Sequence, residues 1–170
     1  MKISDKGINL LKQLEGCVKI GDKHIIYDDQ TGKPVKPKEA LPRGATIGYG
    51  HLIKAGEDFR SGISESQATE LLRADIAVAE CAVQNGIASA LTQNQYDALV
   101  MFAYNIGIKN FTDSTVVKYV NNRNFQNRRY PTLESAWMAW NKSCGREMPG
   151  LTKRRKVEYE LFTNRSVWGN

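Results

Sequence analysis

Two carboxylates and one hydroxyl occur at positions that suit the hydrolysis of a glycosidic bond. Glu15 closes an apolar helical pattern, Asp29 follows an apolar strand-like run, and Thr46 opens the glycine-rich run TIGYGH at 46–51. Glycoside hydrolysis needs a carboxylic acid that protonates the leaving oxygen and a carboxylate that activates water or attacks the sugar. The candidate catalytic residues are therefore Glu15, Asp29 and Thr46.

Local signals predict that Glu15 is the last residue of a helix over 4–15. Ser4 is a suitable N-cap, apolar residues recur at helical spacing, and Gly16 is a suitable residue to end the helix. The negative end of a helix dipole disfavours a further negative charge at this point. A solvated glutamate of the last turn would fit the same pattern, so the position alone does not decide its role.

The segment that carries Asp29 reads as a β-hairpin. Apolar runs at 18–20 and 24–27 flank a turn that starts at Gly21, and residues 28–32 close the second strand. Strand alternation places Tyr27 and Asp29 on one face and Asp28 on the other. The two neighbouring aspartates are therefore expected to have different roles.

A basic loop separates Asp29 from Thr46. Residues 33–43, KPVKPKEALPR, contain three prolines and four cations, which predicts an irregular and exposed loop. Residues 46–49 then return as a short strand, in which glycines permit a ligand to approach the backbone closely.

The chain from Ser64 onward has helical patterns. Ser64 with Gln67 and Thr92 with Gln95 match capping boxes, which predicts a long helix over 64–86 and a second one ending at Gly107. The second helix is apolar nearly all round and is expected to be buried. Shorter helices are predicted over 114–122, 132–141 and 149–163.

Composition indicates an ordinary folded domain with a basic surface. The chain has 170 residues, 41% of them hydrophobic, and a net charge of +6, which favours nucleic acid, anionic lipid or wall polymer without choosing among them. Cys17, Cys81 and Cys144 are far apart and odd in number, so we expect reduced thiols. The start of the chain predicts no signal peptide, and no run approaches the ~20 apolar residues of a membrane span.

Other site chemistries find little support in the sequence. It has no G-x-G-x-x-G or Walker lysine, no H-E-x-x-H and no G-x-S-x-G, so we predict no cofactor and no metal. The run KRRK at 153–156 fits either a solvated helix face or attraction to an anionic polymer. Trp137, Trp140 and Trp168 are interpreted as core residues in preference to platforms for sugars.

These residues together resemble a known signature. Glu15, then YDDQTG at 27–32, then TIGYGH at 46–51 resembles the E … Y-x-D-x-x-G … T-I-G-x-G-H pattern of phage-type lysozymes, the endolysins of glycoside hydrolase family 24. Residues 150–161 are similar to that family's G-L-x-x-R-R-x-x-E-x-x-L pattern. The resemblance extends over nearly the whole chain.

The resemblance implies a role for each candidate. Glu15 would be the general acid, Asp29 would hold the attacking water, and Thr46 would contact the same water, with inversion at the sugar. The register of the motif selects Asp29 over Asp28. By the same resemblance His51 is structural and pairs with Asp75. The hairpin is longer than in the compact relatives, and the 33–43 loop separates Asp29 from Thr46 in sequence.

The fold implied is α+β and lysozyme-like. Residues 1–170 would form a single catalytic domain: a small hairpin-containing lobe (14–63), a connecting helix (64–86), and a larger helical lobe (87–170 with helix 4–15). The active site is expected in the cleft between the lobes.

The predicted enzyme is a muramidase-type glycoside hydrolase. Its substrate would be the β-1,4 bond between N-acetylmuramic acid and N-acetylglucosamine in peptidoglycan. A lytic transglycosylase and a non-catalytic basic wall-binding protein are the alternatives. We expect a monomer that binds no nucleic acid and does not associate integrally with membranes. It would be made in the host cytoplasm and act on the wall in the periplasm after release by another factor.

Overall fold

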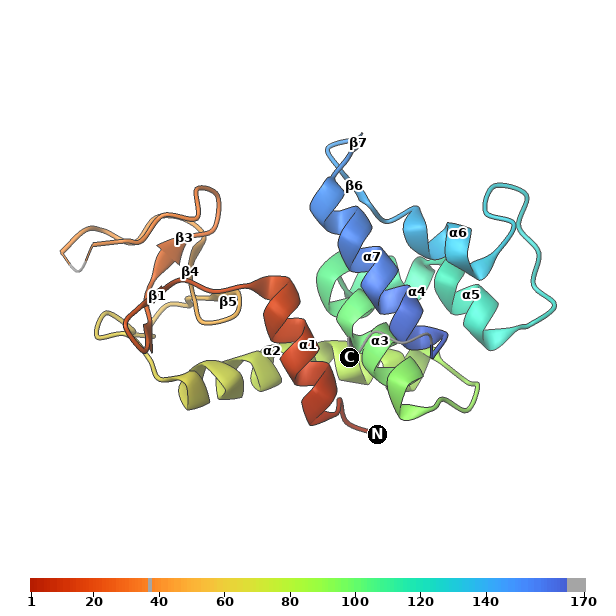
Figure 1. The fold of residues 1–170 in the computed structure, drawn as a ribbon, viewed down its shortest axis with the longest axis horizontal. Helices are drawn as coiled ribbons and strands as arrows, with labels where there is room; N and C mark the ends of the chain where they lie inside the picture. The colour runs from red at the N-terminus through yellow and green to blue at the C-terminus, as the bar shows by residue number, and fades with distance from the viewer. Residues whose placement is uncertain (37, 165–170) are drawn as a thin grey trace. The chain divides into compact units, whose positions relative to one another are not determined.

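The computed structural model describes residues 1–36 and 38–164, which form seven helices and seven short strands (Figure 1). The helices are α1 (Asp5–Glu15), α2 (Glu65–Gly86), α3 (Gln93–Ile106), α4 (Ile108–Asp113), α5 (Thr115–Asn121), α6 (Leu133–Met138) and α7 (Pro149–Phe162). The strands are β1 (Lys19–Ile20), β2 (Lys23–His24), β3 (Tyr27–Asp28), β4 (Ala45–Ile47), β5 (His51–Leu52), β6 (Lys142–Ser143) and β7 (Arg146–Glu147). None of the described helices is both long and apolar enough to cross a membrane.

The chain divides into two compact units. The strand unit is Ile8–Ile76, and the helical unit is Met1–Gly7 together with the chain from Ala77 onward. Helices α1 and α2 each contribute residues to both units. All three candidate catalytic residues belong to the strand unit. The lobe boundaries expected from the sequence stay predictions.

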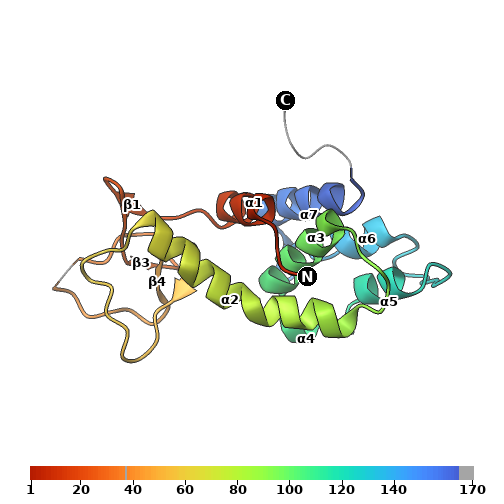
Figure 2. The same ribbon diagram turned by 90° about the horizontal axis from the view of Figure 1, so that it is seen from below.

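The predicted helix starts agree with the structure because they depend on local bonds. The Ser4 hydroxyl accepts the Gly7 N–H at 3.0 Å at the start of α1. At the start of α2, a single uninterrupted helix in Figure 2, Ser64 and Gln67 exchange the two bonds of a capping box, at 2.9 and 3.2 Å. Thr92 and Gln95 form the same motif before α3.

The predicted second hairpin strand is too long. The hairpin around Gly21 forms, with Lys19 opposite His24, but β2 ends at His24. The N–H and the carbonyl of His24 point to the other side of the strand and both bond to Ile63, at 2.9 Å each, while one more bond to the first segment joins the Ile25 N–H to the Val18 carbonyl at 3.1 Å. The next residues start a different sheet of order β3-β4-β5.

The strand predicted over 46–49 is also shorter than expected. Strand β4 ends at Ile47, and a turn leads to β5, where His51 lies opposite Ile47. Gly48 begins this turn with a φ of +65°. A Cβ at Gly48 would lie 3.3 Å from the Ala68 Cβ of α2, so a larger residue would meet both strain and crowding.

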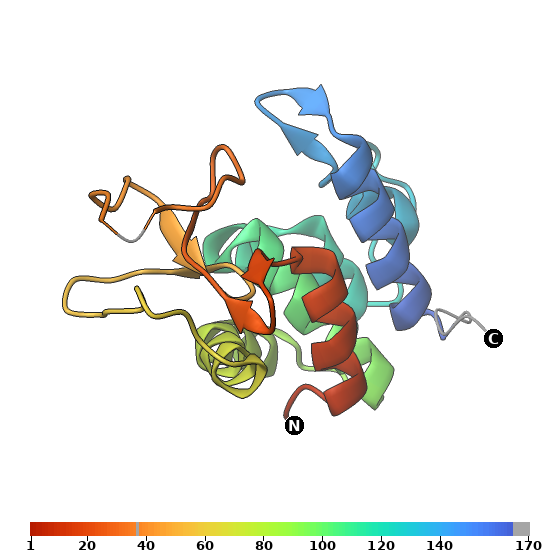
Figure 3. The same cartoon turned by 60° about the vertical axis from the view of Figure 1, so that its left-hand side comes forward.

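The helical unit is built around α3, which packs against α7. The predicted buried helix is confirmed: Phe102 of α3 is fully buried, and its ring lies 4.8 Å from that of Trp137, which is also fully buried. Trp140 is partly buried near Phe102, and Trp168 lies outside the described residues. Helix α4 and the β6–β7 hairpin, seen at the start of α7 in Figure 3, were not predicted.

The basic run at 153–156 is not a continuous cationic face. Arg154 and Arg155 are buried, and each bonds to the fully buried Glu158 at 3.0 Å. Trp137 donates its indole N–H to the same carboxylate at 3.1 Å. Lys153 and Lys156 alone are exposed in this run. The sequence suggested either a solvated helix face or a surface that attracts an anionic polymer. Both interpretations are wrong for the two arginines, because their side chains bind Glu158 in the interior.

Candidate active site

Glu15 is the last residue of α1, as predicted. Gly16 follows with a φ of +67° and donates its N–H to the Lys12 carbonyl at 3.0 Å, which closes the helix. The Glu15 side chain is partly buried. The carboxylate is thus held at a fixed helix end instead of on a mobile loop.

Asp28 and Asp29 have different surroundings. The Asp28 carboxylate accepts the Gln30 N–H and the Thr31 hydroxyl, both at 3.0 Å, and so closes the turn after β3. Asp29 lies in that turn with an exposed side chain, and its N–H points to the Gly44 carbonyl at 3.4 Å. The two aspartates thus differ in their surroundings, and the cause is the turn and not strand alternation, because Asp29 lies beyond the end of the strand. That they also differ in role stays a prediction.

Thr46 lies in β4, directly opposite Tyr27 of β3. It is buried, and its hydroxyl donates to the Gly44 carbonyl at 2.8 Å. The Gly44 carbonyl therefore accepts hydrogen bonds from both the Asp29 N–H and the Thr46 hydroxyl. These bonds hold the two residues close together despite the long loop between them. With its proton engaged, the Thr46 hydroxyl oxygen presents lone pairs to any neighbouring donor.

Tyr27 connects the two carboxylates electrostatically. It is buried, and directly opposite residues of an antiparallel pair have side chains on one face of the sheet, so its ring lies beside Thr46. Burial raises the pKa of the Tyr27 hydroxyl, and the negative charges of Asp29 and Glu15 raise it further. Both carboxylates therefore raise the pKa of one buried phenol, Glu15 from the end of α1 and Asp29 from the turn after β3.

Glu65 is an organising residue that the sequence analysis missed. At the start of α2 its carboxylate accepts bonds from Lys12 (3.0 Å), Lys19 (2.8 Å), His24 (2.9 Å) and the Tyr49 hydroxyl (2.6 Å). Burial alone would raise the pKa of Glu65, but these four donors hold it well below its usual range. Acidic residues favour the first turn of a helix, which was the only available signal, since every partner is distant in sequence.

The predicted pair of His51 and Asp75 is present. The His51 ring is buried, and its Nδ1 lies 2.8 Å from an Asp75 oxygen. Its Nε2 lies 3.1 Å from Glu57, a partner that was not predicted. The same Glu57 oxygen accepts the Lys54 N–H at 2.7 Å. His51 thus joins the 54–57 turn to α2 within the strand unit.

This arrangement predicts an acid-dependent stability. The Lys54 N–H and then His51 lower the pKa of Glu57 against the opposing effect of burial. A carboxylate whose pKa is lower in the folded state stabilises the protein at pH values above its unfolded-state pKa, which is about 4.3 for glutamate. This contribution is lost as the pH falls through the folded-state pKa. We expect Glu57→Gln to lower the Tm by about 2–4 °C near pH 7, allowing for solvent screening of a part-exposed group.

The measurement is a series of thermal melts between pH 3 and pH 7, with Glu70→Gln as the control. Glu70 is an exposed acid of α2 with no hydrogen-bond or ion-pair partner among the described residues. The gap between wild type and Glu57→Gln should narrow as the pH falls below the unfolded value of about 4.3, because the contribution of the ionised carboxylate is lost in that direction. A gap that stays constant over this range would show that the ionised Glu57 contributes nothing.

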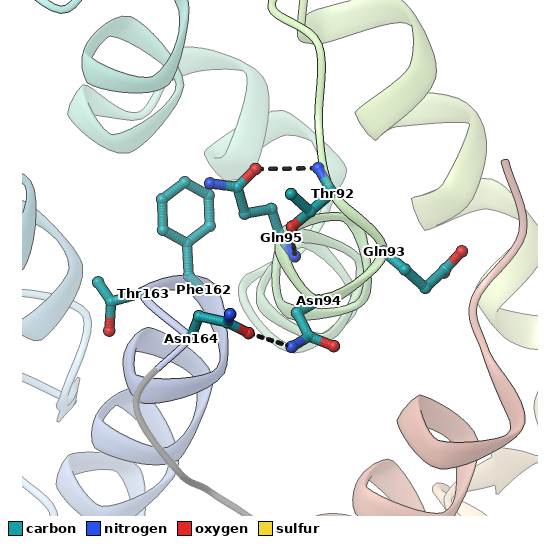
Figure 4. A pocket seen from close by; sticks show the side chains of 7 residues that line it. All are labelled: Thr92, Gln93, Asn94, Gln95, Phe162, Thr163 and Asn164. Atoms are coloured by element: carbon teal, nitrogen blue, oxygen red, sulfur yellow. Dashed lines mark hydrogen bonds between the residues drawn. The ribbon is translucent and has the colours of Figure 1, made fainter.

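A separate pocket in the helical unit lacks these chemical groups. It has a volume of about 540 Å³. Its lining residues are Thr92, Gln93, Asn94, Gln95, Phe162, Thr163 and Asn164 (Figure 4). The amides largely bond within the set, as between Asn94 and Asn164. With no carboxylate in its lining, this pocket does not host the predicted acid chemistry.

Comparison with protein families gives one clear match. The model of the phage lysozyme family matches residues 13–158. An endolysin of Bacillus phage B103 is 37% identical over 95% of this chain, and the endolysin of Salmonella phage P22 is 34% identical over 95%. The chain spans 98% of the P22 protein but only 54% of the B103 protein and 56% of a similar endolysin of Bacillus phage PZA.

Solved structures agree with the fold predicted from the sequence. The muramidase domain of SpmX from Asticaccaulis excentricus superimposes with a TM-score of 0.70 at 32% identity, over 95% of this chain and 97% of that domain. A mutant of P22 lysozyme gives 0.69 at 29% identity, over 96% and 99%. The α+β, lysozyme-like fold class is thereby confirmed.

Proposed function

Since this chain belongs to the phage lysozyme family, we propose that it hydrolyses bacterial peptidoglycan as a muramidase. The bond cleaved is the β-1,4 bond between N-acetylmuramic acid and N-acetylglucosamine. The observation that carries the proposal is the common carbonyl of Gly44, which accepts bonds from the Asp29 N–H and from the Thr46 hydroxyl.

In the proposed mechanism Glu15 protonates the glycosidic oxygen as it leaves. A water donates one hydrogen to the Asp29 carboxylate and the other to the Thr46 hydroxyl oxygen, so its lone pair is free to attack the anomeric carbon. Thr46 suits this role because its own proton is held by Gly44. Attack by water on the face opposite the leaving group inverts the configuration.

The products of the reaction test this proposal. We expect a free reducing muramic acid end, because water is the nucleophile, and an α-anomer as the first product. Mass spectrometry of digested peptidoglycan distinguishes the reducing end from the 1,6-anhydro end of a lytic transglycosylase. Proton NMR within the first minutes reports the anomer. An anhydro end would overturn hydrolysis, a first β-anomer would overturn inversion, and no cleavage would leave only a wall-binding protein.

The remaining proposals concern where and with what the enzyme acts. Its partner is the glycan of the bacterial wall, and it works as a monomer. It reaches the wall in the periplasm after another factor releases it from the host cytoplasm. The endolysins to which it is similar support action on the cell wall.

A further inference from the structure

The 33–43 segment begins and ends beside Asp29. At the start of the segment, the Lys33 carbonyl accepts a hydrogen bond from the Asp28 N–H at 2.9 Å, and Pro34 forms an antiparallel bridge with Tyr27. At its end, Arg43 directly precedes Gly44, whose carbonyl faces the Asp29 N–H. Both stems of this basic loop are thus fixed next to the candidate catalytic carboxylate.

The loop has a positive charge that its neighbours do not balance. Lys33, Lys36, Lys38 and Arg43 are all exposed, and Glu39 is the only acid between 33 and 43. Lys36 faces Glu39 at 3.6 Å. Among the residues that the structure describes, Lys33, Lys38 and Arg43 have no ion-pair partner. Arg60 also contributes positive charge here, since its guanidinium donates to the Glu39 carbonyl at 2.9 Å.

A ligand for these cations must lie close to the bond being cleaved. Lys33 and Arg43 are four and fourteen residues after Asp29 in sequence, yet the bonds above hold the backbone of both near Asp29. The muramic acid whose anomeric carbon is attacked lies beside Asp29 in the proposed mechanism. Each such sugar carries a lactyl-linked peptide with free carboxylates, so anionic groups accompany nearly every scissile bond. A separate phosphate polymer would be attached to only a few sugars.

We propose that Lys33, Lys38 and Arg43 bind the stem-peptide carboxylates of the muramic acid being cleaved. This inference rests on the proposed muramidase function and adds a determinant of substrate specificity to it. Exposed ion pairs are individually weak and screened by salt, so the effect should come from several cations together and diminish at high ionic strength.

The test uses the full chain and soluble, uncross-linked peptidoglycan strands free of teichoic acid. One substrate has its carboxylates coupled to ethanolamine, which removes the charge. The other has them coupled to taurine, which adds similar bulk and restores a negative charge. The wild-type enzyme should show a KM about three- to tenfold lower for the taurine substrate in low salt, with similar kcat on both.

The triple variant Lys33→Gln, Lys38→Gln and Arg43→Gln should bring this KM ratio close to one. A control variant with the same loss of charge, Lys109→Gln, Lys118→Gln and Lys153→Gln, changes three exposed lysines of the helical unit and should keep the wild-type ratio. An unchanged ratio in the loop variant would overturn the inference. So would a wild-type enzyme that cleaves both substrates with equal KM. Failure to cleave either substrate would instead refute the muramidase function.

Discussion

Glu15→Gln should abolish lysis of peptidoglycan while the fold is kept. The substitution preserves the shape of the side chain but removes the proton that it transfers, and general acid catalysis contributes about 10²–10⁴-fold to a rate. The side chain lies at the end of a helix that Ser4 and Gly16 delimit, and neither of these is altered. We therefore expect kcat to fall by about that factor with little change in KM.

The measurement is the release of reducing ends from purified walls, with circular dichroism and thermal melts as the check on folding. Glu70→Gln is a suitable control, since it makes the same chemical change at an exposed site on α2. Near wild-type lysis by a folded Glu15→Gln protein would remove Glu15 from the mechanism.

Asp29→Asn and Asp28→Asn should have opposite profiles. An amide at position 29 can no longer take a proton from the attacking water, so activity should fall by about 10²-fold or more with stability nearly unchanged. An amide at position 28 weakens the bonds to Gln30 and Thr31 that close the turn. We expect it to cost about 0.5–1.5 kcal/mol of stability and only a small part of the activity.

Because the two side chains are neighbours, each variant is the control for the other. Activity assays and urea unfolding on both proteins give the two profiles directly. If Asp28→Asn were the inactive variant, the register of the motif would be shifted by one residue, and the water site would have to be rebuilt around the turn.

The sequence predicted the features whose signals are local. Ser4 marks the start of α1 and Gly16 its end after Glu15. The starts of α2 and α3 follow from capping boxes that involve residues three apart. The separation of Asp28 from Asp29 was also predictable. The predicted reason, side-chain alternation along a strand, was wrong. Strand β3 has only two residues, which is too short a pattern for alternation to be reliable.

The features that sequence reasoning missed depend on distant partners. The bridge between His24 and Ile63, on the outer side of β2, joins residues that are almost forty positions apart. Glu65 gains its four donors from three other segments, and no periodicity encodes that convergence. The KRRK run looked like surface because charge density alone says nothing about a carboxylate buried one turn later.

The buried trio of Arg154, Arg155 and Glu158 affects how related chains should be classified. These residues account for much of the C-terminal G-L-x-x-R-R-x-x-E-x-x-L pattern, and in this structure the two arginines form ion pairs with the buried Glu158 inside the helical unit. Breaking such a buried set costs about 3–5 kcal/mol, so selection for a folded chain suffices to maintain it. A descendant that lost Glu15 and took up a purely structural duty would keep this pattern and still be assigned to the family. Screens for lytic enzymes in new genomes should therefore score the acid at the end of α1 separately from the C-terminal pattern.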